Sequence, residues 1–206
     1  FIEEEELKKI DGFLNIYSND DDSVFYLKLD KKDLNEKFIY FSYVMNAPQG
    51  STLTGGLPSD GKVYEFRSFK KDKIGLYQIN TSYIKGDETN NIARSSITNI
   101  TEAFVEVFKP TARTEDSVLI NLNSIILSEK MDSISYVPSE YREYISVDYG
   151  RPDEAKTFVK NIYNNKTNTA FEVTFAFENV APNPNAYSVS AVTDPRYLSV
   201  TCLLYT

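Results

Sequence analysis

The sequence predicts a mainly β fold of antiparallel sheets, sandwich-like or strongly curved, with two or three short helices. Residues 170–178 (AFEVTFAFE) alternate apolar with mostly polar side chains, which is the period of a strand with one side on the core. Residues 24–29 and 38–43 carry similar runs and are set apart by polar turns. Aromatic residues make up 14% of the chain, as many half-buried strands require. We therefore expect a single β-rich domain over residues 11–206.

The remaining elements follow from the same patterns. Residues 1–10 carry Ile2, Leu7 and Ile10 among acids and lysines, which predicts a leader or a short amphipathic helix. Short helices are also expected at residues 90–101 and 122–130. Further strands are expected at residues 63–69 and 74–79 as a hairpin, at 104–108 pairing with 118–121, and at 187–192 and 197–205.

Composition excludes several classes of function. The net charge of −8 disfavours a nucleic-acid partner, whose phosphates are neutralised by Lys and Arg. No apolar run approaches the roughly 20 residues of a membrane-spanning helix. The acidic start is unlike a signal peptide, so we expect any targeting segment to lie outside this chain. The absence of His excludes His-based triads and His zinc ligands, and Cys202 alone cannot form an internal disulfide. We expect Cys202 to be a buried thiol.

Two polar segments are candidate sites. Residues 46–62 (NAPQGSTLTGGLPSDGK) gather Pro, Gly, Ser and Asn, which predicts a long exposed loop. Such a loop is the best candidate for contact with a partner or substrate, and the residues nominated for it are Gly50, Gly55, Gly56 and Asp60. The other segment is a turn with adjacent carboxylates that could hold calcium, at Asp20, Asp21 and Asp22. That turn lacks the glycine and distal glutamate of an EF-hand loop, so a solvated turn is the favoured alternative.

Four tyrosines in the segment 136–149 raise a third possibility, a platform for a sugar; they are Tyr136, Tyr141, Tyr144 and Tyr149. The chain has no Trp, the residue most suited to such a platform. Tyrosines packed with their hydroxyl groups at the surface are therefore the favoured interpretation.

Several segments together resemble a known family. They are Gly12–Tyr17 (GFLNIY), the strand 38–43 with its Gly-rich loop, residues 63–66 (VYEF), the middle segments 117–121 and 124–128, the strand 170–177, and Asp194-Pro195-Arg196 before the last strand. They are similar to the domain N-terminal to the catalytic domain in large secreted zinc-dependent metallopeptidases of bacteria, many of them Bacteroidetes. The similarity covers residues 10–205.

The resemblance implies a noncatalytic accessory domain that is secreted, periplasmic or at the cell surface. In that family the zinc ligands belong to an HExxH-type helix further along the polypeptide, and no residue here can take their place. It therefore implies no cofactor in this chain, zinc in a downstream catalytic domain that is the partner in cis, and a protein or peptide substrate as a second partner. It also implies O-glycosylation at Asp-Ser pairs, with Ser23, Ser117 and Ser133 as candidates. The alternative is a stand-alone surface module that binds glycan or protein.

Overall fold

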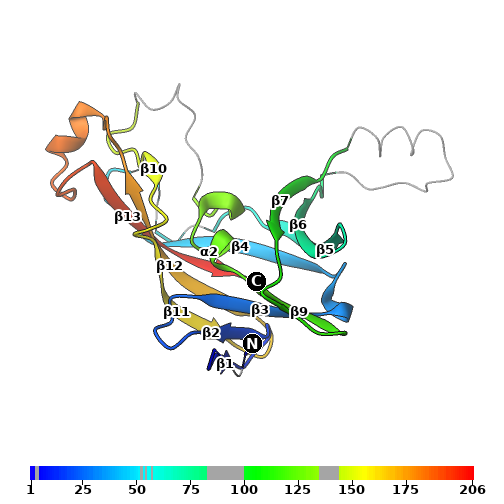
Figure 1. The fold of residues 1–206 in the computed structure, drawn as a ribbon. Coiled ribbons are helices and arrows are strands. Elements are labelled where there is room, and N and C mark those ends of the chain that lie inside the picture. The colour runs from blue at the N-terminus through cyan, green and yellow to red at the C-terminus, as the bar shows by residue number, and fades with distance from the viewer. Residues whose placement is uncertain (3–4, 52, 54, 57, 83–99, 135–143) are drawn as a thin grey trace. The chain divides into compact units, whose positions relative to one another are not determined.

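The computed structural model describes residues 1–2, 5–51, 53, 55–56, 58–82, 100–134 and 144–206 (Figure 1). It is mainly β, with antiparallel sheets, one of them strongly curled, and few short helices, so the predicted fold class is confirmed. The chain forms two compact units. The first comprises Phe1–Lys28, Phe41–Asp60 and Asn121–Thr206, and the second comprises Leu29–Tyr40 and Gly61–Ile120.

The larger sheet of the first unit is built around β12 (Thr169–Glu178). This strand pairs antiparallel with β13 (Tyr197–Tyr205) on one side and with β11 (Phe158–Asn164) and β10 (Arg151–Pro152) on the other (Figure 1). β13 pairs in turn with residues 41–46 of β4 (Lys37–Asn46). Both β12 and β13 lie where the sequence predicted strands. β11 was not predicted.

Three strands of a second, smaller sheet face this one in the same unit. They are β1 (Lys8–Ile10), β2 (Ile16–Ser18) and β3 (Phe25–Asp30), all antiparallel. The rings of Phe25 and Phe171 meet edge to face with centroids 6.1 Å apart. Alternate residues of β12 are buried, as the period-two pattern predicts; they are Phe171, Val173, Phe175 and Phe177.

A short helix was one of the two forms expected for residues 1–10, the other being a leader, and the described residues among them form no helix. Lys8–Ile10 is strand β1, whose residues pair with β2 in the register Lys9 to Tyr17. A helix of fewer than about 12 residues is marginal without tertiary packing. Pairing with a neighbouring strand satisfies the same backbone groups, so the strand is favoured.

The helices of the first unit are short. The predicted helix at 122–130 is confirmed as α2 (Asn123–Ile126) followed by the 3-10 turn η2 (Glu129–Met131). The prediction of a strand at 187–192 was wrong, because the 3-10 helix η4 (Pro184–Ser188) extends to Ser188 and residues 189–192 belong to no strand. Pro184 opens this helix, and the Asn183 side chain accepts a hydrogen bond of 2.9 Å from the backbone N–H of Asn185.

The second unit holds the predicted hairpin of β5 (Lys62–Phe69) and β6 (Lys73–Ile79), with β7 (Ala103–Phe108) beside β6. Residues 37–40 of β4 pair with β5. One face of this sheet is an aromatic and aliphatic core; its buried members include Tyr40, Tyr64, Phe66, Ile74, Leu76 and Phe108. The 3-10 helix η1 (Lys31–Asp33) precedes β4 in the chain.

The pairing expected between 104–108 and 118–121 was wrong. β9 (Ser117–Asn121) pairs with β8 (Ala112–Arg113) instead. The local turn explains this, because the Thr114 hydroxyl accepts a hydrogen bond of 3.0 Å from the backbone N–H of Ser117 and closes a short hairpin. The helix expected at 90–101 falls almost wholly outside the described residues. None of the helices in the described part of the chain has the length and apolar character needed to cross a membrane.

Candidate functional site

Residues 41–46 of β4 pair with β13 on one side, and the loop at residues 46–62 lies along their other side. The backbone N–H of Ser59 donates to the carbonyl of Ser42 at 2.7 Å, and the N–H of Ser42 donates to the Ser59 hydroxyl at 2.9 Å. Gly56 N–H donates to the carbonyl of Val44 at 2.7 Å. An uncovered edge strand is a template for pairing with other chains. This limb of the loop is therefore held against the sheet.

The four nominated loop residues are all exposed. Gly56 has φ +87°, and a Cβ there would meet no atom within 4 Å, so its outer side is open. Gly50 has φ +89° and lies against Val189, where a Cβ would sit 3.4 Å from a methyl carbon. The loop thus presents Gly55, Gly56 and Asp60 on one limb and Gly50 on the other. Their contact with a partner stays a prediction.

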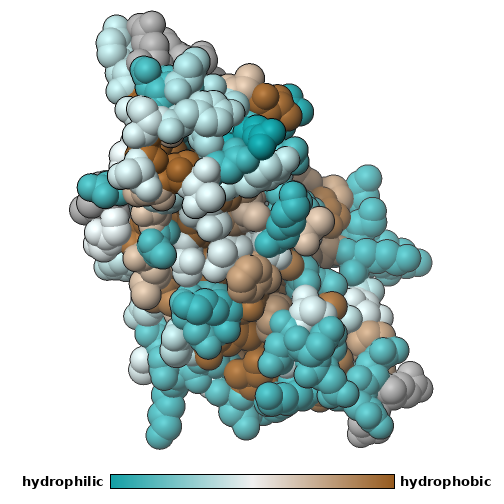
Figure 2. All heavy atoms as spheres, turned by 90° about the vertical axis from the view of Figure 1, so that its left-hand side faces the viewer, coloured by the Kyte–Doolittle hydropathy of each residue, from teal (hydrophilic) through white to brown (hydrophobic). Residues whose placement is uncertain are grey.

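The sheet of β11, β12, β13 and β4 has an outer face, opposite its buried side. Its edges carry large exposed side chains, with Phe158 52% and Tyr163 47% exposed on β11, and Tyr43 38% and Met45 55% exposed on β4. Smaller residues lie between them on the two central strands; they are Thr174, Ala176, Ser199 and Thr201. Figure 2, which views one side of the molecule, shows hydrophobic groups in small patches among hydrophilic ones.

One buried carboxylate lies in this outer face. The Glu172 side chain is 8% exposed and accepts hydrogen bonds from Lys160 Nζ at 2.7 Å, Asn161 Nδ2 at 2.6 Å and the Tyr163 hydroxyl at 3.2 Å. The hydrogen bond from Lys160 is the largest cause that lowers the pKa of Glu172. With three donors the carboxylate is satisfied, so it fixes β11 and Tyr163 in place and is poorly suited to act as a general base.

The second unit carries an arrangement that the sequence did not indicate, which we call the aromatic column. The rings of Tyr77 and Phe104 stack with centroids 4.7 Å apart, and Phe69 follows at 4.9 Å from Phe104. The Arg67 guanidinium lies 4.8 Å from the centroid of Tyr77. Gly75 lies beneath the rings of Tyr77 and Phe104, where a Cβ would come within 2.8 Å of both side chains. The missing side chain of Gly75 therefore leaves room for the rings.

Arg67 is fixed by two carboxylates. Its Nε donates to Glu65 at 2.6 Å and its Nη1 donates to Glu102 at 2.5 Å. These hydrogen bonds, that from Glu65 first, raise the pKa of Arg67. The Glu65 side chain is 7% exposed and that of Arg67 is 30% exposed. The guanidinium is thus held in one orientation against Tyr77, with its charge already matched.

The turn nominated for calcium satisfies its own polar groups. Asn19 Oδ1 accepts from the backbone N–H of Ser23 at 2.9 Å, and Asp21 Oδ1 accepts from the Ser23 hydroxyl at 2.6 Å. The latter hydrogen bond lowers the pKa of Asp21. Asp20 and Asp22 are exposed beside it. Among the described residues, no group of three or more His, Cys, Asp or Glu is placed to hold a metal ion. Calcium binding at this turn stays a prediction.

The three glycosylation candidates differ in accessibility. Ser23 is exposed and Ser117 is partly exposed, whereas Ser133 is only 3% exposed. The backbone carbonyl of Ser133 also accepts a hydrogen bond of 2.7 Å from the buried hydroxyl of Ser42. A glycan on Ser133 would not fit the folded chain.

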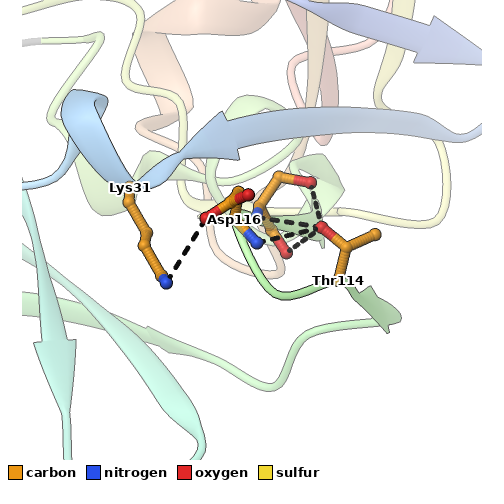
Figure 3. Close-up of polar contacts among 4 residues, drawn as sticks. Lys31, Thr114 and Asp116 are labelled. Carbon is orange, nitrogen blue, oxygen red and sulfur yellow. Dashed lines mark hydrogen bonds and ion pairs between the residues drawn. The ribbon is translucent and has the colours of Figure 1, made fainter.

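The neighbourhood of Ser117 is drawn in Figure 3. Its hydroxyl lies 2.9 Å from the Thr114 hydroxyl, and the backbone N–H of Asp116 donates to the same Thr114 oxygen at 3.3 Å. Asp116 Oδ1 accepts from Lys31 Nζ at 3.4 Å. The Asp-Ser pair therefore sits in an ordered turn with one ion pair at the surface.

Two of the four tyrosines proposed as a platform, Tyr136 and Tyr141, lie outside the described residues. The other two differ in setting. Tyr144 is 77% exposed, whereas Tyr149 packs on Phe177 at 5.2 Å between centroids, and burial raises the pKa of Tyr149 to about 12.

Cys202 is fully buried as predicted, and burial raises the pKa of its thiol to about 12.

The residues that carry the family resemblance have structural roles. A Cβ at Gly12 would come within 2.3 Å of Asn164, whose side-chain amide donates to the carbonyls of Ile10 and Leu14 at 2.8 Å each. Asp194 accepts from the Arg196 guanidinium at 2.6 Å, and this pairing lowers the pKa of Asp194 to about 2. These contacts tie the first turn to β11 and start β13.

Comparison with known proteins adds no relative from which to interpret these surfaces. The chain matches no protein-family model, no curated protein and no solved structure.

Proposed function

We propose that this chain is a noncatalytic accessory domain of a secreted or periplasmic zinc metallopeptidase-like protein. It supports the catalytic domain or the substrate cleft through its exposed surfaces. The chain has no His and so lacks the ligands of an HExxH zinc site. Zinc and catalysis belong to a domain encoded downstream, and this chain supports that domain.

One observation carries this proposal, namely that the residues behind the resemblance build the scaffold. Gly12 allows the close approach of Asn164, and Asp194 pairs with Arg196 at the start of β13. Tyr64, from a further matching segment, is 1% exposed in the core. Residues that serve the fold are those expected to recur in a supporting domain. The surface that remains for a partner includes the loop with Gly56 and Asp60.

The decisive test is the reading frame beyond Thr206. An in-frame HExxH motif supports the proposal. A stop codon directly after Thr206 would remove the catalytic partner in cis and would overturn it.

A second test measures contact by the loop. The catalytic domain, produced separately, is titrated with this chain and with two charge-reversal variants, Asp60→Arg in the loop and Asp20→Arg in the acidic turn. Both residues are exposed, so both variants should fold, which circular dichroism checks. We expect Asp60→Arg to weaken binding at least tenfold, about 1.4 kcal/mol, and Asp20→Arg to have little effect. Equal affinities for all three proteins would remove the loop from the interface.

The outer face favours one other function, a stand-alone module that binds glycan or protein. Exposed aromatic side chains flank hydroxyl groups there, and its one buried carboxylate is matched by Lys160. A glycan array probed with the isolated chain tests this function. Tight binding that is lost in Tyr163→Ala and kept in Tyr144→Ala, an exposed tyrosine elsewhere, would favour the module over the accessory domain.

A further inference from the structure

The aromatic column ends at a basic hairpin tip. The turn between β5 and β6, together with the first residue of β6, carries three exposed lysines, Lys70, Lys71 and Lys73, with Asp72 among them. The Nζ of Lys70 lies 5.4 Å from the centroid of the Phe69 ring, and Lys73 pairs across the hairpin with Phe69. The apolar rings and the lysines therefore form one continuous surface, which we call the column and tip.

The sign of the local charge differs between the two ends of the column and tip. At the base of the column two carboxylates, Glu65 and Glu102, enclose the single guanidinium of Arg67, so negative charge is in excess there. At the tip three lysines accompany one aspartate, in a chain whose net charge is −8. The tip is a local excess of positive charge, and a ligand that complements it must be negative near the tip and uncharged over the rings.

The rings limit the kind of ligand further. Arg67 covers one face of Tyr77 and Phe104 covers the other, so a sugar or a nucleobase cannot stack on Tyr77. Phe104 is 47% exposed. The part open to a ligand is thus the exposed side of the stacked rings, which suits an apolar side chain laid across it.

We propose that the column and tip bind an acidic polypeptide segment that carries an aromatic or large aliphatic side chain. Carboxylates of the segment pair with the tip lysines, and its apolar side chain packs on Phe104 and Phe69. Charge complementarity selects this occupant, because the tip attracts carboxylates while the closed Tyr77 stack offers no platform for a base or a sugar. The inference rests on the proposed function, since it names the chemistry of a partner for a domain that acts by binding.

The experiment uses the intact chain and defined peptides. A fluorescent probe of sequence EEFEEGEEFEE is compared with one in which Gln replaces every Glu and with one in which Ala replaces every Phe. Fluorescence anisotropy gives the Kd of each at low and at high salt. The variants are Phe104→Ala, Lys71→Glu and, as a matched control on an exposed turn of the first unit, Lys166→Glu.

We expect the Glu and Phe probe to bind at least about tenfold more tightly than either companion and to weaken as salt is raised. Phe104→Ala and Lys71→Glu should each weaken it at least about fivefold, while Lys166→Glu leaves it within twofold. Equal binding of the Phe-free probe would mean nonspecific attraction of a polyanion and would overturn the proposal. Failure of the probe to bind at about 1 mM, the weak end of measurable affinity, would do the same.

A failure of this proposal can be told apart from a failure of the accessory role. A peptide that fails to bind leaves the reading frame beyond Thr206 and the titration with the catalytic domain unchanged. A stop codon after Thr206 would overturn the accessory role and leave the peptide result as it stands.

Discussion

The buried carboxylate of Glu172 offers a sharp test of how the outer face is held together. The change Glu172→Gln keeps the shape of the side chain and removes its charge. One amide oxygen remains to accept hydrogen bonds where the carboxylate accepted from Lys160, Asn161 and Tyr163. At least one of these donors is left opposite the new NH2 group.

The expected loss follows from the exposure of each donor. The Lys160 side chain is 56% exposed, so solvent screens its ion pair and that pair contributes little. Asn161 and Tyr163 both donate to Oε2, whose place the amide oxygen can take; their bonds then reach a neutral acceptor in place of a charged one, which should lower the free energy of unfolding by about 1–2 kcal/mol at pH 7.

The effect of pH on the contribution of Glu172 to stability has a definite sign. The folded chain lowers the pKa of Glu172, so the ionised form contributes its full stability above the unfolded pKa, about 4.3, and loses it as pH falls through the folded value. The difference between wild type and Glu172→Gln should therefore narrow below pH 4. Urea unfolding followed by circular dichroism, at pH 7 and below pH 4, measures the free energy of unfolding of both proteins. The control is Glu178→Gln, a change at an exposed position on the same strand. A difference that is absent at pH 7, or that does not change with pH, would refute the reasoning.

Four further outcomes are expected. Phe175 is fully buried, and since even Phe→Ala in a core costs about 3–5 kcal/mol, Phe175→Asp should unfold or aggregate the chain; an unchanged thermal transition would count against its place in the core. Gly12→Ala should lower the free energy of unfolding by about 1–3 kcal/mol, because its Cβ would overlap Asn164; urea titration measures this, and a loss near zero would contradict it. Cys202 should react with a thiol reagent at pH 8 far more slowly in the native chain than in denaturant, and equal rates would show that it is accessible. Millimolar calcium should leave the thermal transition almost unchanged, because Asp21 already accepts hydrogen bonds within its turn; a clear rise would identify the turn as a calcium site.

Strands with a clean alternation were predictable from the sequence because their signal is local. β3 buries every second side chain and β12 buries the alternate apolar set from Phe171 to Phe177, and the pattern can be seen without knowledge of their neighbours. β11 was missed because a bulge interrupts its pairing between Val159 and Asn161, so its residues do not alternate. The segment 187–192 misled in the opposite direction, since the turn that begins at Pro184 decides its conformation.

The candidate sites were harder to predict, because they depend on register. Arg67, Tyr77 and Phe104 come from three strands and meet only when β5, β6 and β7 pair as they do. The one signal in the sequence was Gly75, a glycine inside a strand pattern, which often marks close approach of another group. The loop at 46–62 was recognised from composition, but its attachment to β4 was not, because hydrogen bonds such as that from Gly56 to Val44 leave no mark in composition.

Strand β4 has a consequence for the order in which the chain is made. Its residues 37–40 belong to the second unit and its residues 41–46 to the first, and the first unit is drawn from three separate stretches. A ribosome that has released Ile120 has supplied every residue of the second unit. The first unit still lacks β13, the strand that stands between β12 and β4, until residues 197–205 emerge. During synthesis the second unit can close early, while residues 41–46 wait for a partner strand that lies much further along the chain.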